Sequence, residues 1–300
     1  MKHIPVLLSE AIDSLQLKPN QNVVDCTLGD AGHSEIILQK IAPKGKLLGI
    51  DLDAEAVLRS KRFLYNFESR TVIARDNFAN LKAIAEKNNF KPVNAILMDL
   101  GWSTPQFEER GRGFSFLKDE PLDMRYSTIE LQTAADIINS YSESELAGIF
   151  KNFGEESLSK EIAKAVASYR KNKKIAKTGE LAEIILQVYR EKLRTNKEIP
   201  WIGGLHPATK VFQALRMEVN HELDNLKKVL PQAVEILAGG GRLAVISFHS
   251  LEDRIVKQYF KSIAGKTIKL INKKPLIASE EEIKNNPRAR SAKLRVIEKI

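Results

Sequence analysis

Three aspartates stand where apolar runs of this sequence end. Asp25 ends the first run, Asp51 ends the second and Asp99 ends a later one. If these runs are neighbouring parallel strands, their carboxyl ends lie at one edge of a sheet and bring the three carboxylates together. Carboxylates accept hydrogen bonds and attract cations, and a buried one needs such a partner. Three of them at one edge therefore indicate a binding or catalytic site.

Asp51 lies where a nucleoside cofactor presents its ribose. An acid at the end of the second strand can accept hydrogen bonds from both ribose hydroxyls of NAD or of S-adenosylmethionine (SAM). Asp25 and Asp30 would crowd the pyrophosphate of NAD, whereas the cationic sulfonium of SAM tolerates nearby acids. Phe78 could flank the adenine or belong to the core. The carboxylates favour SAM, with a solvated loop acid as the alternative for Asp51.

The turn 28–32 resembles a ligand-binding loop without matching a known nucleotide fingerprint. Gly29 and Gly32 allow the backbone to approach a ligand, and the start of the following helix adds a partial positive charge. Thr27 stands where G-x-G-x-x-G has its first glycine, and no Gly-Lys-Ser/Thr follows. A plain tight turn between strand and helix is the alternative.

A second polar segment, 247–254, contains serine, histidine and acidic residues. It lacks the G-x-S-x-G turn of a serine hydrolase, so we expect Ser250 to cap a helix instead. His33, His206 and His249 match no zinc motif in their spacing, and no metal is expected.

Strand and helix patterns alternate through the first hundred residues. Strands are expected at 22–27, 46–51, 71–74 and 93–98, with helices at 33–41, 54–63 and 81–87. Such βαβ units predict an α/β fold, with a doubly wound, mostly parallel sheet covered on both faces.

The alternation stops after the fourth strand. Residues 104–125 read as a loop, and residues 133–194 show only helix patterns, with a capping box at Ser142 and Glu145 and a cap at Thr178. The α/β pattern resumes with a long helix to about residue 230, kinked by Pro231. A strand at 242–248, a helix at 251–263 and final strands at 266–271 and 294–297 follow. We therefore expect a core of residues 1–104 and 207–300, interrupted by a helical substrate-recognition domain at 105–206.

The charge balance favours an anionic partner. The net charge is +9 and the pI is about 9.4, which is typical of nucleic-acid-binding proteins. Two basic segments could bind phosphates, with a solvated basic surface as the alternative. Their candidate RNA-binding residues are Arg170, Lys171, Lys173 and Lys174 in the first segment and Arg288, Arg290 and Lys293 in the second.

The sequence also indicates a cellular compartment. Cys26 is the single cysteine, so the chain can form no internal disulfide, which suits the reducing cytoplasm. No apolar run reaches the 18 or so residues of a membrane span. We expect a cytoplasmic protein without a membrane partner.

Short strings that match one known family extend over nearly the whole chain. They are HIPVLLSEAI, VVDCTLGDAGHS, GIDLD, ILMDLGWSTPQ, RGFSF, PLDMR, HPATKVFQALRMEVNHEL, GGRLAVISFHSLEDRIVK and NPRARSAKLRVIEK. Through them the sequence closely resembles the RsmH (MraW) family of 16S rRNA cytosine-N4 methyltransferases. The resemblance implies a Rossmann-like SAM methyltransferase core with a helical insertion. It implies the cofactor contacts Ala31, Gly32, His33, Asp51, Phe78, Asp99 and Gln106.

The resemblance also implies a substrate, which is a specific cytidine in the decoding (P-site) region of 16S rRNA in the small ribosomal subunit. The sequence does not decide the oligomeric state, and a homodimer is possible. The sequence departs from the family pattern at Ala31, where glycine is usual, and at Trp102, where an aliphatic residue is common. Ala31 would be strained if its φ were positive.

Methyl transfer to an exocyclic amine requires orientation of a weak nucleophile. Asp99, or the carbonyls of Leu100 and Gly101, could accept hydrogen bonds from the amine. The target base must leave its stack, and Trp102 could stack on it or pack against the inserted domain. His249 is a candidate proton acceptor or RNA contact. The rival hypotheses are a SAM methyltransferase acting on a protein or small molecule, and an RNA-binding assembly factor without catalysis.

Overall fold

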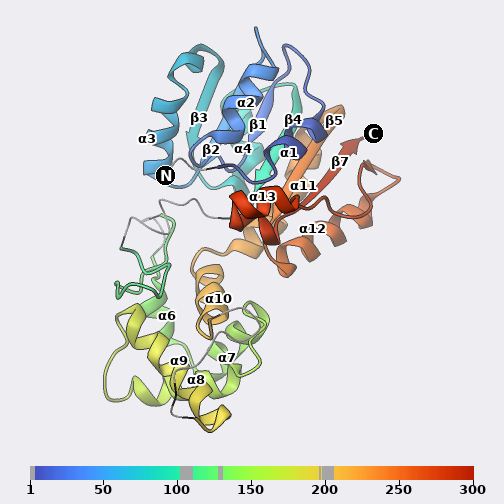
Figure 1. The fold of residues 1–300 in the computed structure, drawn as a ribbon. Helices are drawn as coiled ribbons and strands as arrows, with labels where there is room; N and C mark the ends of the chain where they lie inside the picture. The colour runs from blue at the N-terminus through green and yellow to red at the C-terminus, as the bar shows by residue number, and fades with distance from the viewer. Residues whose placement is uncertain (1–3, 102–110, 128–130, 196, 198–205) are drawn as a thin grey trace. The chain divides into compact units, whose positions relative to one another are not determined.

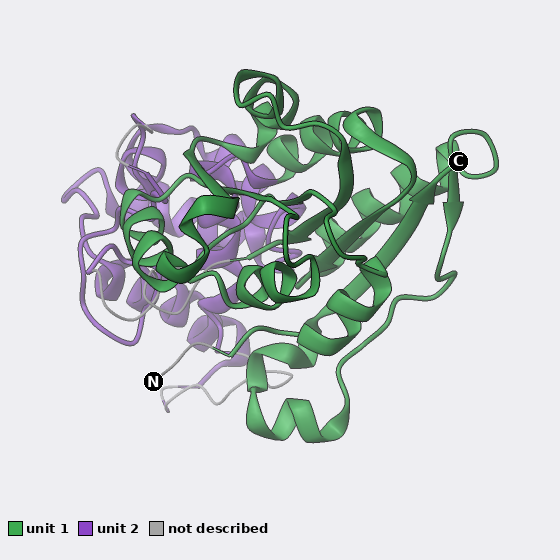
Figure 2. Ribbon diagram, turned by 90° about the horizontal axis from the view of Figure 1, so that it is seen from above, with its two compact units in different colours: residues 1–103, 223–300 green, residues 104–222 purple. Residues whose placement is uncertain are grey.

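A computed structural model describes residues 4–101, 111–127, 131–195, 197 and 206–300 of the protein. The chain divides into two compact units, coloured green and purple in Figure 2. Unit 1 comprises Met1–Ser103 and Leu223–Ile300, and unit 2 comprises Thr104–Glu222. None of the described helices is both long enough and apolar enough to cross a membrane.

Unit 1 is built on a seven-stranded sheet, visible in Figure 1. The strands are β1 (Val23–Asp25), β2 (Leu47–Asp51), β3 (Thr71–Arg75), β4 (Val93–Asp99), β5 (Leu237–Ser247), β6 (Ile268–Leu270) and β7 (Lys293–Lys299), in the order β3-β2-β1-β4-β5-β7-β6. Strands β1 to β5 pair in parallel, and β7 runs antiparallel to both of its neighbours. The expected α/β fold with a Rossmann-like, mostly parallel sheet is confirmed.

Helices cover both faces of this sheet because successive strand residues alternate between two apolar clusters. Val23 of β1 packs in the cluster that contains α1 (Leu8–Leu15) and α2 (Gly32–Lys40). Val24 packs in the other cluster, with α4 (Leu81–Lys87), α11 (Glu222–Ile236) and α12 (Ser250–Ile263). The remaining elements of unit 1 are α3 (Ala54–Phe63), α13 (Glu280–Asn285) and the short 3₁₀ helices η1 (Tyr65–Arg70), η2 (Phe78–Asn80) and η3 (Pro287–Ser291).

The regular elements described in unit 2 are all helices. They are α6 (Ala134–Ser140), α7 (Glu143–Asn152), α8 (Ser159–Tyr169), α9 (Thr178–Leu193) and α10 (Thr209–Val219), packed around one apolar core. Ser142 and Glu145 form the predicted capping box of α7. Thr178 is not the cap of α9: its hydroxyl accepts the Glu120 amide at 3.0 Å and donates to the Lys118 carbonyl at 2.7 Å, which holds residues 118–120.

The return from unit 2 to the core differs from the prediction. The expected single helix is divided into α10 and α11 at Asn220 and His221, where His221 adopts a left-handed φ of 50°. The side chain of Asn220 instead bonds the Met124 carbonyl and the Tyr126 amide, each at 2.8 Å. Because its apolar residues pack in the core of unit 2, α10 belongs to that unit, and the second boundary follows Glu222 rather than residue 206.

Substitution of Gly32, the first residue of α2, tests how tightly the N-terminal segment packs against this helix. A Cβ atom at Gly32 would lie 2.4 Å from Cγ of Pro5, whose rigid ring cannot rotate away. We expect Gly32→Ala to lower the free energy of unfolding by about 1–3 kcal/mol, measured by denaturant titration. Gly148→Ala is the matched control, because its new methyl meets nothing within 4 Å inside a helix. Equal destabilisation by the two substitutions would contradict this packing.

Candidate functional site

The sheet brings the three predicted acids to one edge. Strand β1 lies between β2 and β4, and Asp25 pairs with Gly49 on one side and Leu97 on the other. Asp51 and Asp99 therefore extend two residues beyond Asp25 at the carboxyl ends of the two neighbouring strands. This edge is where open α/β sheets bind ligands.

Asp25 is the structural member of the group. Its buried carboxylate accepts the hydroxyl of Ser34 at 2.6 Å and the amide of Thr27 at 3.1 Å. Burial raises the pKa of Asp25, and these hydrogen bonds act against that rise. Both oxygens are occupied, so Asp25 ties the end of β1 to helix α2 and adds negative charge beneath the site.

Asp51 organises the loop that follows β1. Its two carboxylate oxygens accept the amides of Gly29 and Asp53, each at 2.8 Å. Burial raises the pKa of Asp51 to about 6 although both hydrogen bonds favour the charged form. Each oxygen retains a second lone pair. The side chain can therefore still accept a hydrogen bond from a ligand hydroxyl at each oxygen.

Asp99 has the least satisfied carboxylate of the three. Its Oδ1 is buried and has no hydrogen-bond partner among the described residues, and its Oδ2 lies 3.7 Å from Nδ1 of His33. Burial, followed by the charges of Asp25 and Glu252, raises the pKa of Asp99 well above its ordinary value. An environment of this kind disfavours a carboxylate unless a cation or a hydrogen-bond donor joins it.

His33 is oriented by the N-terminal segment. Its Nε2 lies 3.1 Å from the carbonyl of Val6, which can only accept a hydrogen bond, so Nε2 is the donor there, and Nδ1 faces Oδ2 of Asp99 at 3.7 Å. Glu282 accepts the amide of Leu7 at 2.7 Å, and Asn286 donates to the carbonyl of Ile4 at 3.1 Å. Sequence reasoning missed these links because they join residues more than 270 positions apart.

The backbone around the site contains strained turns. Gly29 and Ala31 have φ values of 49° and 64°, so Ala31 occupies the left-handed region that favours glycine. The expected strain is present and costs about 1–2 kcal/mol. Gly101 has a φ of 144°, and a Cβ there would meet the ring of Phe248 at 3.1 Å. The turn after β4 therefore requires glycine.

The structure gives His249 a local role. His249, not Ser250, is the N-cap of α12, and its Nδ1 accepts the amide of Glu252 at 3.4 Å. Its Nε2 lies 3.2 Å from Glu252 Oε1 without the alignment of a hydrogen bond. Glu252, which sequence reasoning missed, accepts the amide of Phe248 at 2.9 Å and adds charge near Asp99.

Phe78 is half-buried at the start of η2 and packs on the core while keeping one side accessible. Both interpretations of this ring, as a core residue and as an adenine contact, are compatible with that position. Trp102 and Gln106 lie outside the described residues.

The basic candidates separate into engaged and exposed side chains. Arg170 donates to the carbonyls of Ile138 and Tyr141, which secures the end of α6. Lys173 pairs with Glu180 at 2.6 Å, and Lys293 lies 3.9 Å from Asp253. The other four candidates are Lys171, Lys174 and Arg290, which are exposed, and Arg288, which is half-buried.

The crowding at Asp99 predicts a change in stability. Asp99→Asn removes a desolvated charge that is repelled by Asp25 and Glu252, so the ligand-free variant should unfold a few degrees higher than wild type at pH 7.5. A raised carboxyl pKa destabilises the fold increasingly as pH rises above the unfolded value, so the gain should shrink at pH 5. Calorimetric melting at both pH values checks this, and a lower melting temperature at pH 7.5 would contradict it.

Comparisons with known proteins identify the family of this chain. The curated relatives include proteins named ribosomal RNA small subunit methyltransferase H. That of Dictyoglomus thermophilum is 47% identical over 298 residues, covering 99% of this chain and 96% of the relative. That of Clostridioides difficile is 44% identical over 314 residues, covering 99% of each chain.

A relative with the same name in Clostridium botulinum (strain Loch Maree) is 45% identical over 315 residues, covering 100% of this chain and 99% of the relative. The model of the MraW methylase family matches residues 1–300. With the fold, the acid-lined sheet edge and these matches, the chain belongs to the MraW methylase family.

Proposed function

We propose that the protein is a SAM-dependent methyltransferase that methylates the N4 amine of a specific cytidine in the decoding region of 16S rRNA. The observation that carries the proposal is the buried Oδ1 of Asp99, which has no hydrogen-bond partner among the described residues. A cationic cofactor and an amine donor would supply the partners that this carboxylate lacks. The relatives named as small subunit rRNA methyltransferases support the choice of substrate.

The described residues fit SAM as the cofactor, which when bound supplies an electrophilic methyl group on a cationic sulfur. Asp51 would hold the ribose through the free lone pairs of its two oxygens. The first amides of α2, at Gly32 and His33, favour a carboxylate such as the one SAM carries. Phe78 would contact the adenine, and Gln106 remains a proposed contact on the basis of the family resemblance.

Asp99 is the proposed acceptor for the substrate amine. The lone pair of a cytosine N4 is delocalised into the ring, so the protein must hold the amine in line and accept its hydrogens as it becomes tetrahedral. The Oδ1 of Asp99 is available for one such hydrogen bond. The carbonyls of Leu100 and Gly101 stay as alternatives, and Trp102 stays a proposed stacking platform for the extruded base.

His33 and the neighbouring acids control the charge on Asp99. A protonated Asp99 can donate towards the Nδ1 lone pair of His33, whereas Asp25 and Glu252 repel an ionised Asp99. A cation in the site reverses this preference and makes Asp99 an acceptor. The acceptor would therefore form only in the loaded enzyme.

The wider proposals follow from the substrate. The small ribosomal subunit is the proposed partner and the cytoplasm the proposed location. The remaining candidates for phosphate contacts are Lys171, Lys174, Arg288 and Arg290. The guanidinium of Arg170 is already hydrogen-bonded to carbonyls within unit 2. Unit 2 would serve as the substrate-recognition domain, and His249 has no assigned step.

Asp51 should control cofactor affinity. Asp51→Asn replaces one hydrogen-bond acceptor by a donor, so SAM affinity measured by calorimetry should fall by at least about tenfold. Because the pKa of Asp51 is raised to about 6, wild-type affinity should decrease as pH falls from 7 to 5. This decrease should be smaller in the variant. Wild-type affinity in Asp51→Asn would contradict the ribose assignment.

The reaction is tested by locating the transferred methyl. The enzyme would be incubated with methyl-labelled SAM and, separately, with small ribosomal subunits, free 16S rRNA and mixed protein, followed by mass spectrometry of nucleosides and peptides. We expect N4-methylcytidine in 16S rRNA, at one position. Label only in protein, or on another atom of the RNA, would overturn the proposed function.

A further inference from the structure

Helix α8 of unit 2 has one apolar face and one basic face. Ile162, Ala163 and Val166 are buried in the core of the unit, whereas Lys160 and Lys164 are exposed. Lys171 follows the helix in a turn, with its amide bonded to the Ser168 carbonyl at 3.3 Å. At 3.6 residues per turn, Lys160 and Lys164 lie about 40° apart around the helix, and Lys171 lies in the turn just beyond its end. These three residues are called the lysine face.

The lysine face is unneutralised within the part of the chain that the structure describes. Lys160, Lys164 and Lys171 make no ion pair with any described residue. Neighbouring cations differ, because Lys173 is paired with Glu180 and Lys177 with Asp119. Glu161 is the acid of α8; it lies about 100° around the helix from Lys160 and about 60° from Lys164, and it forms no ion pair with either lysine among the described residues.

The position of Lys160 works against the helix. Lys160 is in the first turn of α8, where the helix dipole makes a cation unfavourable by about 0.3–1 kcal/mol. Ala167 and Ser168 separate Lys164 from Lys171, so small side chains leave the helix surface open between the charges. A row of exposed lysines that form no ion pair with the described residues suits a polyanion that binds along it.

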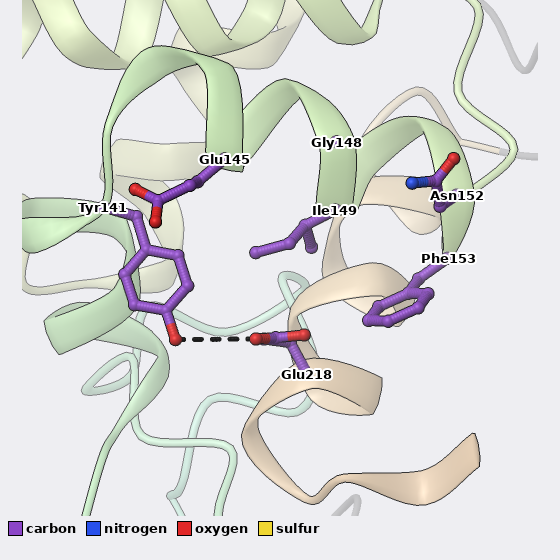
Figure 3. Close-up of a pocket in the computed structure, with 7 residues that line it drawn as sticks. All are labelled: Tyr141, Glu145, Gly148, Ile149, Asn152, Phe153 and Glu218. Carbon is purple, nitrogen blue, oxygen red and sulfur yellow. Dashed lines mark hydrogen bonds between the residues drawn. The ribbon is translucent and has the colours of Figure 1, made fainter. Parts of the chain in front are cut away.

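A hollow elsewhere in unit 2 has the opposite charge. This hollow has a volume of about 430 Å³. Figure 3 shows the residues that line it, which are Glu145 and Glu218 together with Tyr141, Gly148, Ile149, Asn152 and Phe153. The hydroxyl of Tyr141 lies 3.5 Å from a Glu218 oxygen. Two carboxylates at this surface would repel phosphates. Unit 2 therefore offers a polyanion one favourable surface on α8 and one unfavourable surface between α7 and α10.

We propose that the lysine face binds the sugar-phosphate backbone of the RNA substrate. The inference rests on the proposed function and adds Lys160 and Lys164, which the basic segment 170–177 did not include. Contacts of this kind position a nucleic acid without reading its sequence, and they release counterions from the phosphates. The lysine face would thus set the affinity for RNA and its salt dependence. The choice of cytidine would be made at the sheet edge of unit 1 that carries Asp51 and Asp99.

The test is the triple variant Lys160→Gln/Lys164→Gln/Lys171→Gln in the full chain. Binding to small ribosomal subunits and to 16S rRNA would be measured between 0.05 and 0.3 M potassium chloride. The negative slope of log K against log salt should become shallower by about 2, because each of the three single-strand phosphate contacts contributes about 0.7. Affinity at about 0.1 M salt should drop at least about tenfold, while SAM affinity stays at the wild-type value and the melting temperature does not fall.

A matched control removes the same charge from unit 1. Lys44→Gln/Lys61→Gln/Lys87→Gln changes three exposed lysines that have no place in the proposed site, and its salt slope should stay near wild type. An unchanged slope in the lysine-face variant, or an equal fall in both variants, would overturn the proposal. Binding of the wild type and the lysine-face variant to vesicles of anionic lipid would be measured as well. If the lysine-face variant lost vesicle binding but kept wild-type RNA binding, the proposal would also be overturned. Failure of wild type to bind or methylate rRNA would instead refute the proposed function.

Discussion

The repulsion between buried carboxylates at one edge of the sheet is the constraint that the surrounding residues of unit 1 must accommodate. Asp25, Asp51 and Asp99 extend from three adjacent strands, and burial raises the pKa of each. A fold selected only for stability would not place three desolvated acids together. Their position becomes favourable when a ligand brings positive charge and hydroxyl donors. Under the proposed function, the cofactor would stabilise this arrangement.

Local structure around the acids holds them in place. The loop amides of Gly29 and Asp53 fix Asp51, and the imidazole of His33, anchored by the Val6 carbonyl, faces Asp99. The left-handed Ala31 adds strain at the same turn. Strain and unpaired charge often occur together at functional sites, where tertiary packing maintains conformations that a free chain would avoid.

Short-range patterns predicted most of the architecture, and long-range contacts limited the rest. Helices α3 and α4 begin and end at the predicted residues because their apolar spacing is local, and Asp53 caps α3 by accepting the amide of Glu55. The break at His221 was missed because Asn220 is drawn out of the helix by Met124 and Tyr126, about 95 positions earlier. The three acids were found from strand ends, whereas no sequence pattern connected Glu252 with Asp99 or Val6 with His33. The carbonyl partners of Arg170 were not predicted either, because charge alone cannot reveal them.

The most direct test of this account is proton release when SAM binds. Calorimetry at pH 6.5 in buffers of different ionisation enthalpy reports the number of protons exchanged. If a cationic cofactor ionises carboxyl groups whose pKa values are raised, binding should release protons from wild type, and Asp99→Asn should release fewer. Binding with no net proton release, or equal release by the two proteins, would contradict the claim that the buried acids await a cation.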